Sequence, residues 1–392
     1  MEGHLDLSKS GFSTRAIHAG FHPDSTGTVV TPIYTTSTFC LDIDKPLGEN
    51  KYIYSRFSHP NRNNLEECIA SLECTKYCRA FASGMAAVAA ILHTLRPGDE
   101  VITSEDIYGG TMGYFMKEAI NSQGLSFKMA DYSHLDQFEK LFTEKTKIVW
   151  LESPSNPLLK VHDIKKVAEI AHKHKALLVA DNTFMSPYLQ NPIKLGADIV
   201  MHSCTKYISG HSDLIMGVVC TNSDDLDKAL YSIQKSLGSC AGPFECYLAV
   251  RGLKTLCVRM KTAEANTQKL AEFLSTHPKV EKVYFPGLKT DPGYELQKTQ
   301  ARGFGSMLSM TLKGNAETTK NFVKSLKLVA YAVSLGACET LCTIPGLTTH
   351  LCVDQETRKK LGVTDTLIRF AIGIEDYEDI LEDFTQAFDK LK

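Results

Sequence analysis

The sequence predicts an α/β fold with a mostly parallel central sheet and a smaller α+β domain at its C-terminal end. Between about residues 60 and 250, short apolar runs typical of buried strands alternate with stretches that repeat apolar residues at helical spacing. Such alternation predicts parallel strands with helices on both faces of the sheet. The expected strands are 100–103, 126–129, 147–151, 177–180, 198–201 and 216–220, and the expected helices include 135–143 and 161–174.

The pattern changes past residue 251. Helical stretches over 258–276, 316–325 and 377–391 alternate with strand-like runs over 307–312 and 367–372, which predicts the smaller domain. The first fifty-odd residues are rich in Thr, Pro and Gly, as in extended arms that another subunit or domain holds in place. We therefore expect an arm over 1–58, an α/β domain over 59–250 and an α+β domain over 251–392.

Composition favours a small-molecule partner. The 43 Lys plus Arg and 45 Asp plus Glu give a net charge of −2, so no sustained basic field attracts nucleic acid or anionic membrane. No apolar run approaches the length of a membrane span, and the first residues lack the pattern of a signal peptide, so a cytoplasmic location is expected. The 12 cysteines lack the spacing of a disulfide scaffold or a zinc site, and no metal is expected.

Polar residues follow four of the expected strands. Ligands of parallel α/β sheets bind beyond the carboxyl ends of the strands, so these residues predict a single active-site rim. The four groups are Tyr108 to Gly110, Ser153 to Asn156, Asp181 to Thr183, and Ser203 to Lys206.

Lys206 is the first candidate for chemistry. A lysine at the end of a strand, beside Ser203 and Thr205, suits imine formation with a carbonyl cofactor whose phosphate needs hydrogen-bond donors. The alternative is an ordinary lysine in a surface loop. Ser83 and Gly84, with Met85, open an apolar helical stretch, and helix N-termini bind phosphate, although such turns are also common helix caps. Together with Ser203 and Thr205 they would complete a phosphate cup.

Three further side chains each have two possible roles. Asp181 would pair with a protonated pyridine nitrogen, or it caps a turn. Tyr108, before two glycines, would stack on a heterocycle, or it is a core tyrosine. Arg369 lies in an apolar run and needs an anionic partner, which is a substrate carboxylate or an internal salt bridge.

These motifs together resemble the pyridoxal-phosphate enzymes of cysteine and methionine metabolism, the trans-sulfuration family, and are most similar to its cystathionine γ-lyase group. The resemblance runs along nearly the whole chain and implies the fold of aspartate aminotransferase, fold type I. Its segments are Tyr54 to Arg56, Phe81 to Gly84, Tyr108 to Thr111, Glu152 to Pro157, Asp181 to Tyr188, Thr205 to Asp213, Arg251 to Leu256, Ser334 to Gly336, and Leu367 to Arg369.

The resemblance implies a role for each matching position. Lys206 would hold pyridoxal 5′-phosphate and move protons with help from Tyr108, which would also stack on the cofactor, and Asp181 would pair with its ring nitrogen. An active site shared between subunits is implied too, in an obligate dimer doubled to a homotetramer. The other cofactor-binding residues would be Gly84, Met85, Thr183, Ser203 and Thr205, with Tyr54 and Arg56 from a neighbouring subunit, and the substrate-binding residues Asn156, Ser334, Leu335, Arg369, Tyr54, Ile53 and Val333.

The activity that the resemblance implies is elimination from a sulfur amino acid, giving a 2-oxo acid, ammonia and a thiol such as cysteine. Ile53 and Val333 replace acidic residues that cystathionine γ-lyases tend to carry, which favours a simpler thioether such as methionine. Gly110 instead matches the cystathionine lyases, since methionine γ-lyases carry cysteine there. Cystathionine β-lyase and methionine γ-lyase remain alternatives, followed by sulfhydrylases and synthases that act on homoserine esters. Hydrogen sulfide release from cysteine is an expected side activity.

Two readings from other classes rank lower. Ser203 to Lys206 also fits the Ser-x-x-Lys signature of serine acyl-transfer enzymes, but the companion Ser-Asp-Asn and Lys-Thr-Gly elements are missing from the sequence. A catalytically dead homologue would have lost Lys206, Asp181 or Arg369, and all of them are present.

Overall fold

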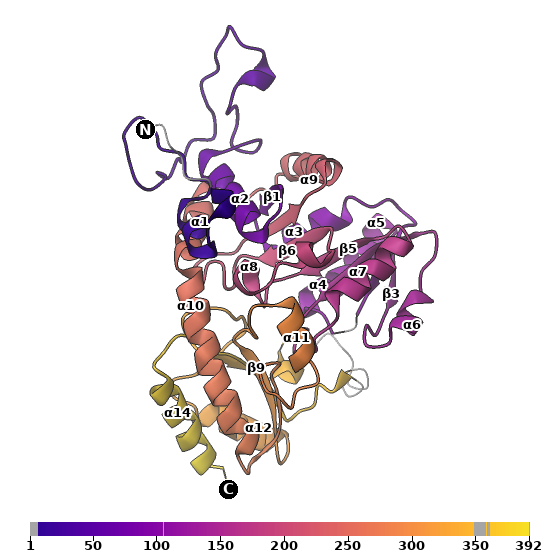
Figure 1. Ribbon diagram of the computed structural model, residues 1–392, viewed down its shortest axis with the longest axis vertical. Coiled ribbons are helices and arrows are strands. Elements are labelled where there is room, and N and C mark those ends of the chain that lie inside the picture. Colours follow the sequence, from indigo (N-terminus) through magenta and orange to yellow (C-terminus); the bar gives the residue numbers. More distant parts are fainter. Residues whose placement is uncertain (1–6, 105, 349–357, 359–360, 392) are drawn as a thin grey trace.

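The central sheet has seven strands and is mostly parallel, so the predicted fold class is confirmed. A computed structural model describes residues 7–104, 106–348, 358 and 361–391 (Figure 1). One strand, β7, runs antiparallel to both of its neighbours, and the other pairs are parallel. The strand order is β1 (Tyr77–Phe81), β7 (Gly217–Thr221), β6 (Ile199–Ser203), β5 (Leu177–Asp181), β4 (Thr146–Glu152), β2 (Glu100–Thr103) and β3 (Ser126–Met129).

Helices cover both faces of this sheet because its central strands are apolar on both sides. Side chains that alternate along β5 and β6 enter two different cores: Val179 and Ile199 lie in one, and Leu178 and Val200 in the other. The first core is covered by α3 (Gly84–Leu92) and α9 (Asp224–Leu237), and the second by α1 (Phe12–His18), α2 (Pro60–Glu73), α7 (Ile164–Lys173) and part of α10 (Pro243–Thr276).

A second sheet of five strands forms the C-terminal part. Its strand order is β10 (Ala330–Tyr331), β11 (Leu341–Thr343), β12 (Leu367–Ala371), β9 (Met307–Leu312) and β8 (Val280–Tyr284). The apolar core of this sheet is shared with the end of α10, α12 (Ala316–Ser325) and α14 (Tyr377–Asp389). The shorter helices of the chain are α4 (Gly109–Gly113), α5 (Ile120–Gln123), α6 (Leu135–Glu139), α8 (Ser186–Leu189) and α11 (Tyr294–Gln300).

The long helix α10 runs from the first sheet to the second (Figure 1). It begins at Pro243, well before the expected start at 258, so the expected boundary at 250 lies inside it. The division of the chain into domains stays a prediction. Among the described residues, no helix is long and apolar enough to cross a membrane.

Most of the N-terminal arm extends away from the rest of the chain (Figure 1). Its helix α1 packs against α2 and α10, whereas the apolar side chains of Val29 and Ile43 are 85% and 96% exposed. Such exposure of large apolar side chains is typical of surfaces that another chain covers.

Candidate active site

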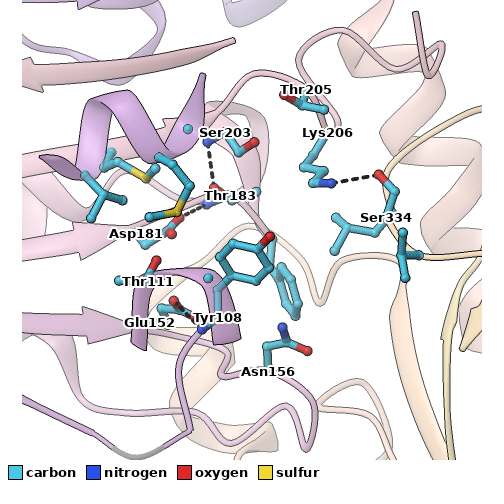
Figure 2. Close-up of a pocket in the computed structure, with 18 of the residues that line it drawn as sticks. Tyr108, Thr111, Glu152, Asn156, Asp181, Thr183, Ser203, Thr205, Lys206 and Ser334 are labelled. Atoms are coloured by element: carbon cyan, nitrogen blue, oxygen red, sulfur yellow. Dashed lines mark hydrogen bonds between the residues drawn. The ribbon is translucent and has the colours of Figure 1, made fainter. Parts of the chain in front are cut away.

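A pocket of about 660 Å³ opens at the carboxyl ends of β4, β5 and β6, as the sequence predicts (Figure 2). These strands are parallel neighbours, and Glu152, Asp181 and Met201 are aligned at their ends. Residues 333–335 and 369, from the C-terminal part of the chain, line the other side. The predicted site residues that line the pocket are Gly84, Met85, Tyr108, Asn156, Asp181, Thr183, Ser203, Thr205, Lys206, Val333, Ser334, Leu335 and Arg369.

Lys206 is fixed in the pocket rather than free in a surface loop. It lies in the turn after β6, where the N–H of Gly210 donates to its carbonyl at 2.8 Å. Its Nζ donates to Oγ of Ser334 at 2.7 Å. Burial, and then the positive charge of Arg369, lower the pKa of the Lys206 amine to about 8. An amine with this pKa is partly neutral near pH 7, so it can act as a nucleophile or a base.

The start of α3 lies directly against the end of β6, at the edge of the pocket. Ser83 caps the helix by accepting the N–H of Ala86 at 3.0 Å, while the first N–H groups, those of Gly84 and Met85, have no acceptor within the helix. A Cβ at Gly84 would lie 3.1 Å from Cβ and Oγ of Ser203, so glycine allows this close approach. The arrangement brings helix N–H groups and a hydroxyl together, as an anion site requires.

Asp181 is a buried carboxylate that also shapes its own turn. Its Oδ1 accepts the N–H of Thr183 at 3.0 Å, and Oγ1 of Thr183 accepts the N–H of Ser203 at 2.9 Å. Burial raises the pKa of Asp181, opposed by the bonds from Thr183 and by the charge of His202. Asp181 therefore does cap its turn, which was one of its two predicted roles. A cation placed in the pocket would favour the ionised carboxylate.

Tyr108 is 47% exposed and points into the pocket, so it is no core tyrosine (Figure 2). Its N–H donates to Oε1 of Glu152 at 2.9 Å. The sequence analysis did not assign Glu152 to the site. Burial raises the pKa of Glu152 well above its usual value, and the neighbouring Asp181 raises it further. Burial raises the pKa of Asp181 as well, so neither carboxyl group of the pair is favoured as an anion by its burial alone.

Arg369 lies on β12 and is 3% exposed. Its Nη1 donates to Oδ1 of Asn156 at 3.1 Å and its Nη2 to the carbonyl of Ser334 at 3.0 Å. Ser334 has a strained φ of 99°, and the bonds of its Oγ to Lys206 and of its carbonyl to Arg369 help to hold this backbone conformation. Within the described residues, Arg369 forms no ion pair with a carboxylate and its buried Nε has no acceptor. The arginine is thus available to a carboxylate that enters the pocket.

Comparison with known proteins agrees with this geometry. The family model of the Cys/Met metabolism PLP-dependent enzymes matches residues 13–389. The chain belongs to this family. This PLP enzyme is 50% identical over 96% of its length to the cystathionine γ-lyase of Dictyostelium discoideum, of which 97% is covered. It is 44% identical over 97% of its length to the cystathionine β-lyase of Lactococcus lactis subsp. cremoris (strain MG1363), of which 100% is covered.

A solved structure agrees as well. The crystal structure of metB from Corynebacterium glutamicum superposes with a TM-score of 0.94 at 42% sequence identity, covering 99% of this chain and 100% of that one. Family and fold are therefore as the sequence predicts. The Ser-x-x-Lys acyl-transfer reading is wrong, because the lysine belongs to a PLP enzyme.

Pyridoxal 5′-phosphate is the cofactor of this PLP enzyme, and the pocket fits it. The helix N–H groups of Gly84 and Met85 suit the phosphate, and the buried Asp181 suits a cationic ring nitrogen. Lys206 supplies the partly neutral amine. The groups that the cofactor needs thus lie around one cavity.

Three predicted residues of this PLP enzyme do not line the pocket of the single chain: Ile53, Tyr54 and Arg56. Nη1 of Arg56 donates to the carbonyl of Lys235 at 2.6 Å, and its guanidinium lies 5.0 Å from the Phe57 ring. Their contribution to the active site of a neighbouring subunit stays a prediction.

Several lining residues escaped the sequence analysis. Glu152 directly follows the apolar run 147–151, so the rule that found Asp181 would have found it. Thr111, whose buried Oγ1 has no partner in the described chain, offers no comparable signal. The other lining residues not assigned are Val88, Phe184, Met201, Ile215 and Thr348, whereas Ser83, Gly110 and Pro154 lie in segments that the sequence analysis placed at the site.

Proposed function

We propose that the protein is a carbon–sulfur lyase of the cystathionine γ-lyase type. It would cleave cystathionine at the γ-carbon to give 2-oxobutanoate, ammonia and cysteine. The observation that carries the proposal is the convergence of Lys206, Asp181 and Arg369 on one pocket, in a chain half identical to a relative of that name. The lower identity to the β-lyase makes cystathionine β-lyase the second candidate.

Each residue of the pocket has a place in this chemistry. Bound pyridoxal phosphate supplies an electron sink for negative charge that develops at the α-carbon of the substrate. Asp181 would hold the ring nitrogen protonated, and Tyr108 would cover one face of the ring. Gly84, Met85, Ser203 and Thr205 would hold the phosphate. Thr183 would act through Ser203, whose N–H it binds.

Lys206 would move the protons. Its amine accepts the α-proton only in the neutral form, and the pKa of about 8 makes that form accessible near neutral pH. The neutral fraction falls as the pH drops below 8. The bond to Ser334 aims the amine, and Lys206 or Tyr108 would return a proton to the departing sulfur.

Arg369 and Asn156 would bind the substrate carboxylate, which positions the α-carbon against Lys206. Val333 is 62% exposed beside Leu335 at the pocket wall. With Ile53 from a neighbouring subunit it would form an apolar wall around the distal part of the substrate. This wall suits methionine as well as cystathionine.

Gly110 supports the cystathionine lyase type over methionine γ-lyase. A Cβ at this position would lie 2.9 Å from Cζ and 3.1 Å from Oη of Tyr108, so any side chain moves the ring. We expect Gly110→Cys to lower kcat/KM for cystathionine about 10- to 100-fold, because small displacements of catalytic groups cost rates of this order. Steady-state kinetics measures the effect.

Gly113→Ala is the matched control for that substitution. It lies on the same short helix, and a Cβ there would meet nothing within 4 Å. Its kcat/KM should stay close to wild type. An unchanged kcat/KM in Gly110→Cys would show that the Tyr108 ring position does not govern the reaction.

Product analysis tests the proposed function directly. Purified protein is incubated separately with cystathionine, methionine and cysteine, and the oxo acids and thiols are identified. We expect 2-oxobutanoate and cysteine from cystathionine, and hydrogen sulfide from cysteine by the shared elimination chemistry. Pyruvate alone from cystathionine would instead establish β-elimination, and a higher kcat/KM for methionine would establish a methionine γ-lyase.

The assembly belongs to the same proposal. A homotetramer built from dimers that share active sites is supported by the exposed arm and by the position of Tyr54 and Arg56 outside the pocket of their own chain. The proposed cytoplasmic location rests on the sequence pattern alone. The proposed division at residues 58 and 250 assigns these two residues to the arm. Sedimentation of the purified protein measures the assembly.

A further inference from the structure

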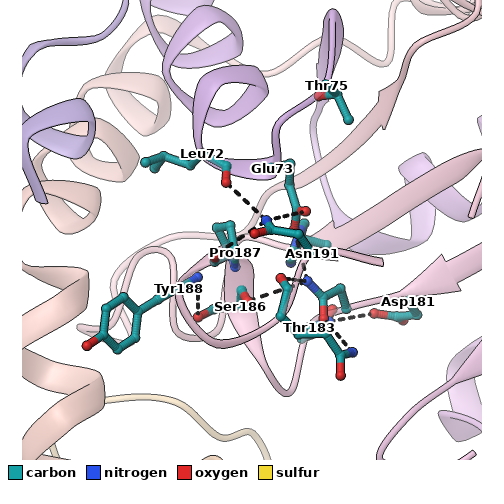
Figure 3. Close-up of polar contacts among 12 residues, drawn as sticks. Leu72, Glu73, Thr75, Asp181, Thr183, Ser186, Pro187, Tyr188 and Asn191 are labelled. Carbon is teal, nitrogen blue, oxygen red and sulfur yellow. Dashed lines mark hydrogen bonds and ion pairs between the residues drawn. The ribbon is translucent and has the colours of Figure 1, made fainter. Parts of the chain in front are cut away.

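A buried polar cluster lies behind the pocket, next to Asp181 (Figure 3). Its centre is Glu73, the last residue of α2, with an exposed fraction of 0%. The carboxylate accepts Nδ2 of Asn182 at 2.9 Å and Nδ2 of Asn191 at 3.1 Å. It also bonds Nε2 of His202, whose exposed fraction is 1%.

The cluster connects the two strand ends that carry the site. Asn182 directly follows Asp181 on β5, and His202 directly precedes Ser203 on β6. Met201 and Ser203 line the pocket, so the alternation of a strand turns His202 to the opposite face of the sheet. Glu73 therefore contacts the residues adjoining the cofactor site from behind.

The charges of this cluster act on Asp181. Glu73 bonds three side chains, those of Asn182, Asn191 and His202. Its carboxylate therefore holds the imidazole of His202 in place beside the end of β5. Positive charge on His202 lowers the pKa of Asp181, against the burial that raises it.

We propose that Glu73 and His202 form a positioning pair that keeps Asp181 anionic and its strand end in place for the ring nitrogen of pyridoxal phosphate. The inference rests on the proposed pairing of Asp181 with that nitrogen. It needs no assumption about the substrate. The pair is distinct from the residues that touch the cofactor, and it gives a role to two buried ionisable groups that the reaction does not otherwise use.

The test compares two cofactors on cofactor-free protein. One is pyridoxal phosphate, and the other is its analogue in which CH replaces the ring nitrogen, so that nothing remains for Asp181 to pair with. In Glu73→Gln the carboxylate that bonds Nε2 of His202 is gone. We expect this variant to bind pyridoxal phosphate about tenfold more weakly, the equivalent of one unit in the pKa of Asp181, with little change for the analogue.

A second variant separates charge from packing. His202→Gln keeps an N–H donor for Glu73 but carries no charge, so it should fold and show the same selective loss. Asp383→Asn is the matched control. This buried carboxylate accepts the N–H groups of 327–329 in the C-terminal part of the chain, so its loss should lower stability without discriminating between the cofactors.

The outcomes are distinct. Selective loss of pyridoxal phosphate affinity in both pair variants supports the positioning role. Equal loss for the two cofactors, or no loss for either, overturns it and leaves the cluster as structure only. Asp181→Ala is measured alongside: if it too fails to discriminate, the proposed role of Asp181 is wrong, which is a separate failure from that of the pair.

Discussion

Replacing Lys206 by alanine is expected to lower kcat/KM for cystathionine by roughly 1,000-fold or more. The variant lacks both the amine that attaches the cofactor and the base that takes the α-proton, and a positioned base alone contributes about 100- to 10,000-fold. Lys206→Arg should lower kcat/KM by as much, because a guanidinium stays protonated at the working pH. Steady-state rates with added pyridoxal phosphate measure the effect.

The protein itself offers a second measurement. In cofactor-free wild type, acylation of the Lys206 amine should rise with pH through a midpoint near 8, the value to which burial and Arg369 lower its pKa from 10.5. Lys166→Ala, on the exposed face of α7, is the control for activity and should match wild type. Full activity in Lys206→Ala would remove the basis of the proposed mechanism.

The fold was predictable because its signals are local. The expected strands 100–103, 126–129 and 307–312 coincide with β2, β3 and β9, and the residues of β2 and β9 are buried on both faces. Strand β1 was missed because Arg79 interrupts its apolar run. The structure places that arginine against Asp227, with Nε to Oδ1 at 2.7 Å, and this pairing is 148 residues away in sequence. Sequence patterns carry no sign of such a partner.

The site was predictable for a different reason. Parallel strands bring their carboxyl ends to one edge, so Asp181, Asn156 and Lys206 could be grouped without knowing the strand order. From its own sequence pattern Arg369 could be assigned only as a buried cation in need of an anion. The family resemblance grouped it with Asn156 and Ser334, and the structure shows the bonds that join them. The sequence analysis could not identify Glu73, because this residue lies at the end of a helix and is far along the sequence from the residues that line the pocket.

Arg369→Lys is expected to lower kcat/KM for cystathionine by about 100- to 1,000-fold, the range for truncating one partner of a buried charged contact. Lysine keeps the charge but loses the planar fork that binds a carboxylate through two parallel bonds. It also frees Asn156 and the carbonyl of Ser334 from the bonds that now hold them. Most of the loss should appear in KM if the arginine binds substrate and transition state alike.

A substrate analogue in which hydrogen replaces the α-carboxylate decides whether the lost contact is to that group. The wild type should have a much lower kcat/KM for the analogue than for cystathionine. Arg369→Ala should have nearly the same kcat/KM for both. The same variant should raise the pKa of Lys206, because the positive charge of Arg369 is one cause of its lowering. Arg259→Lys, a buried arginine bonded to the carbonyls of Tyr207 and Gly252, controls for lost stability and should keep the wild-type discrimination. Equal discrimination in Arg369→Ala and wild type would place the carboxylate elsewhere in the pocket.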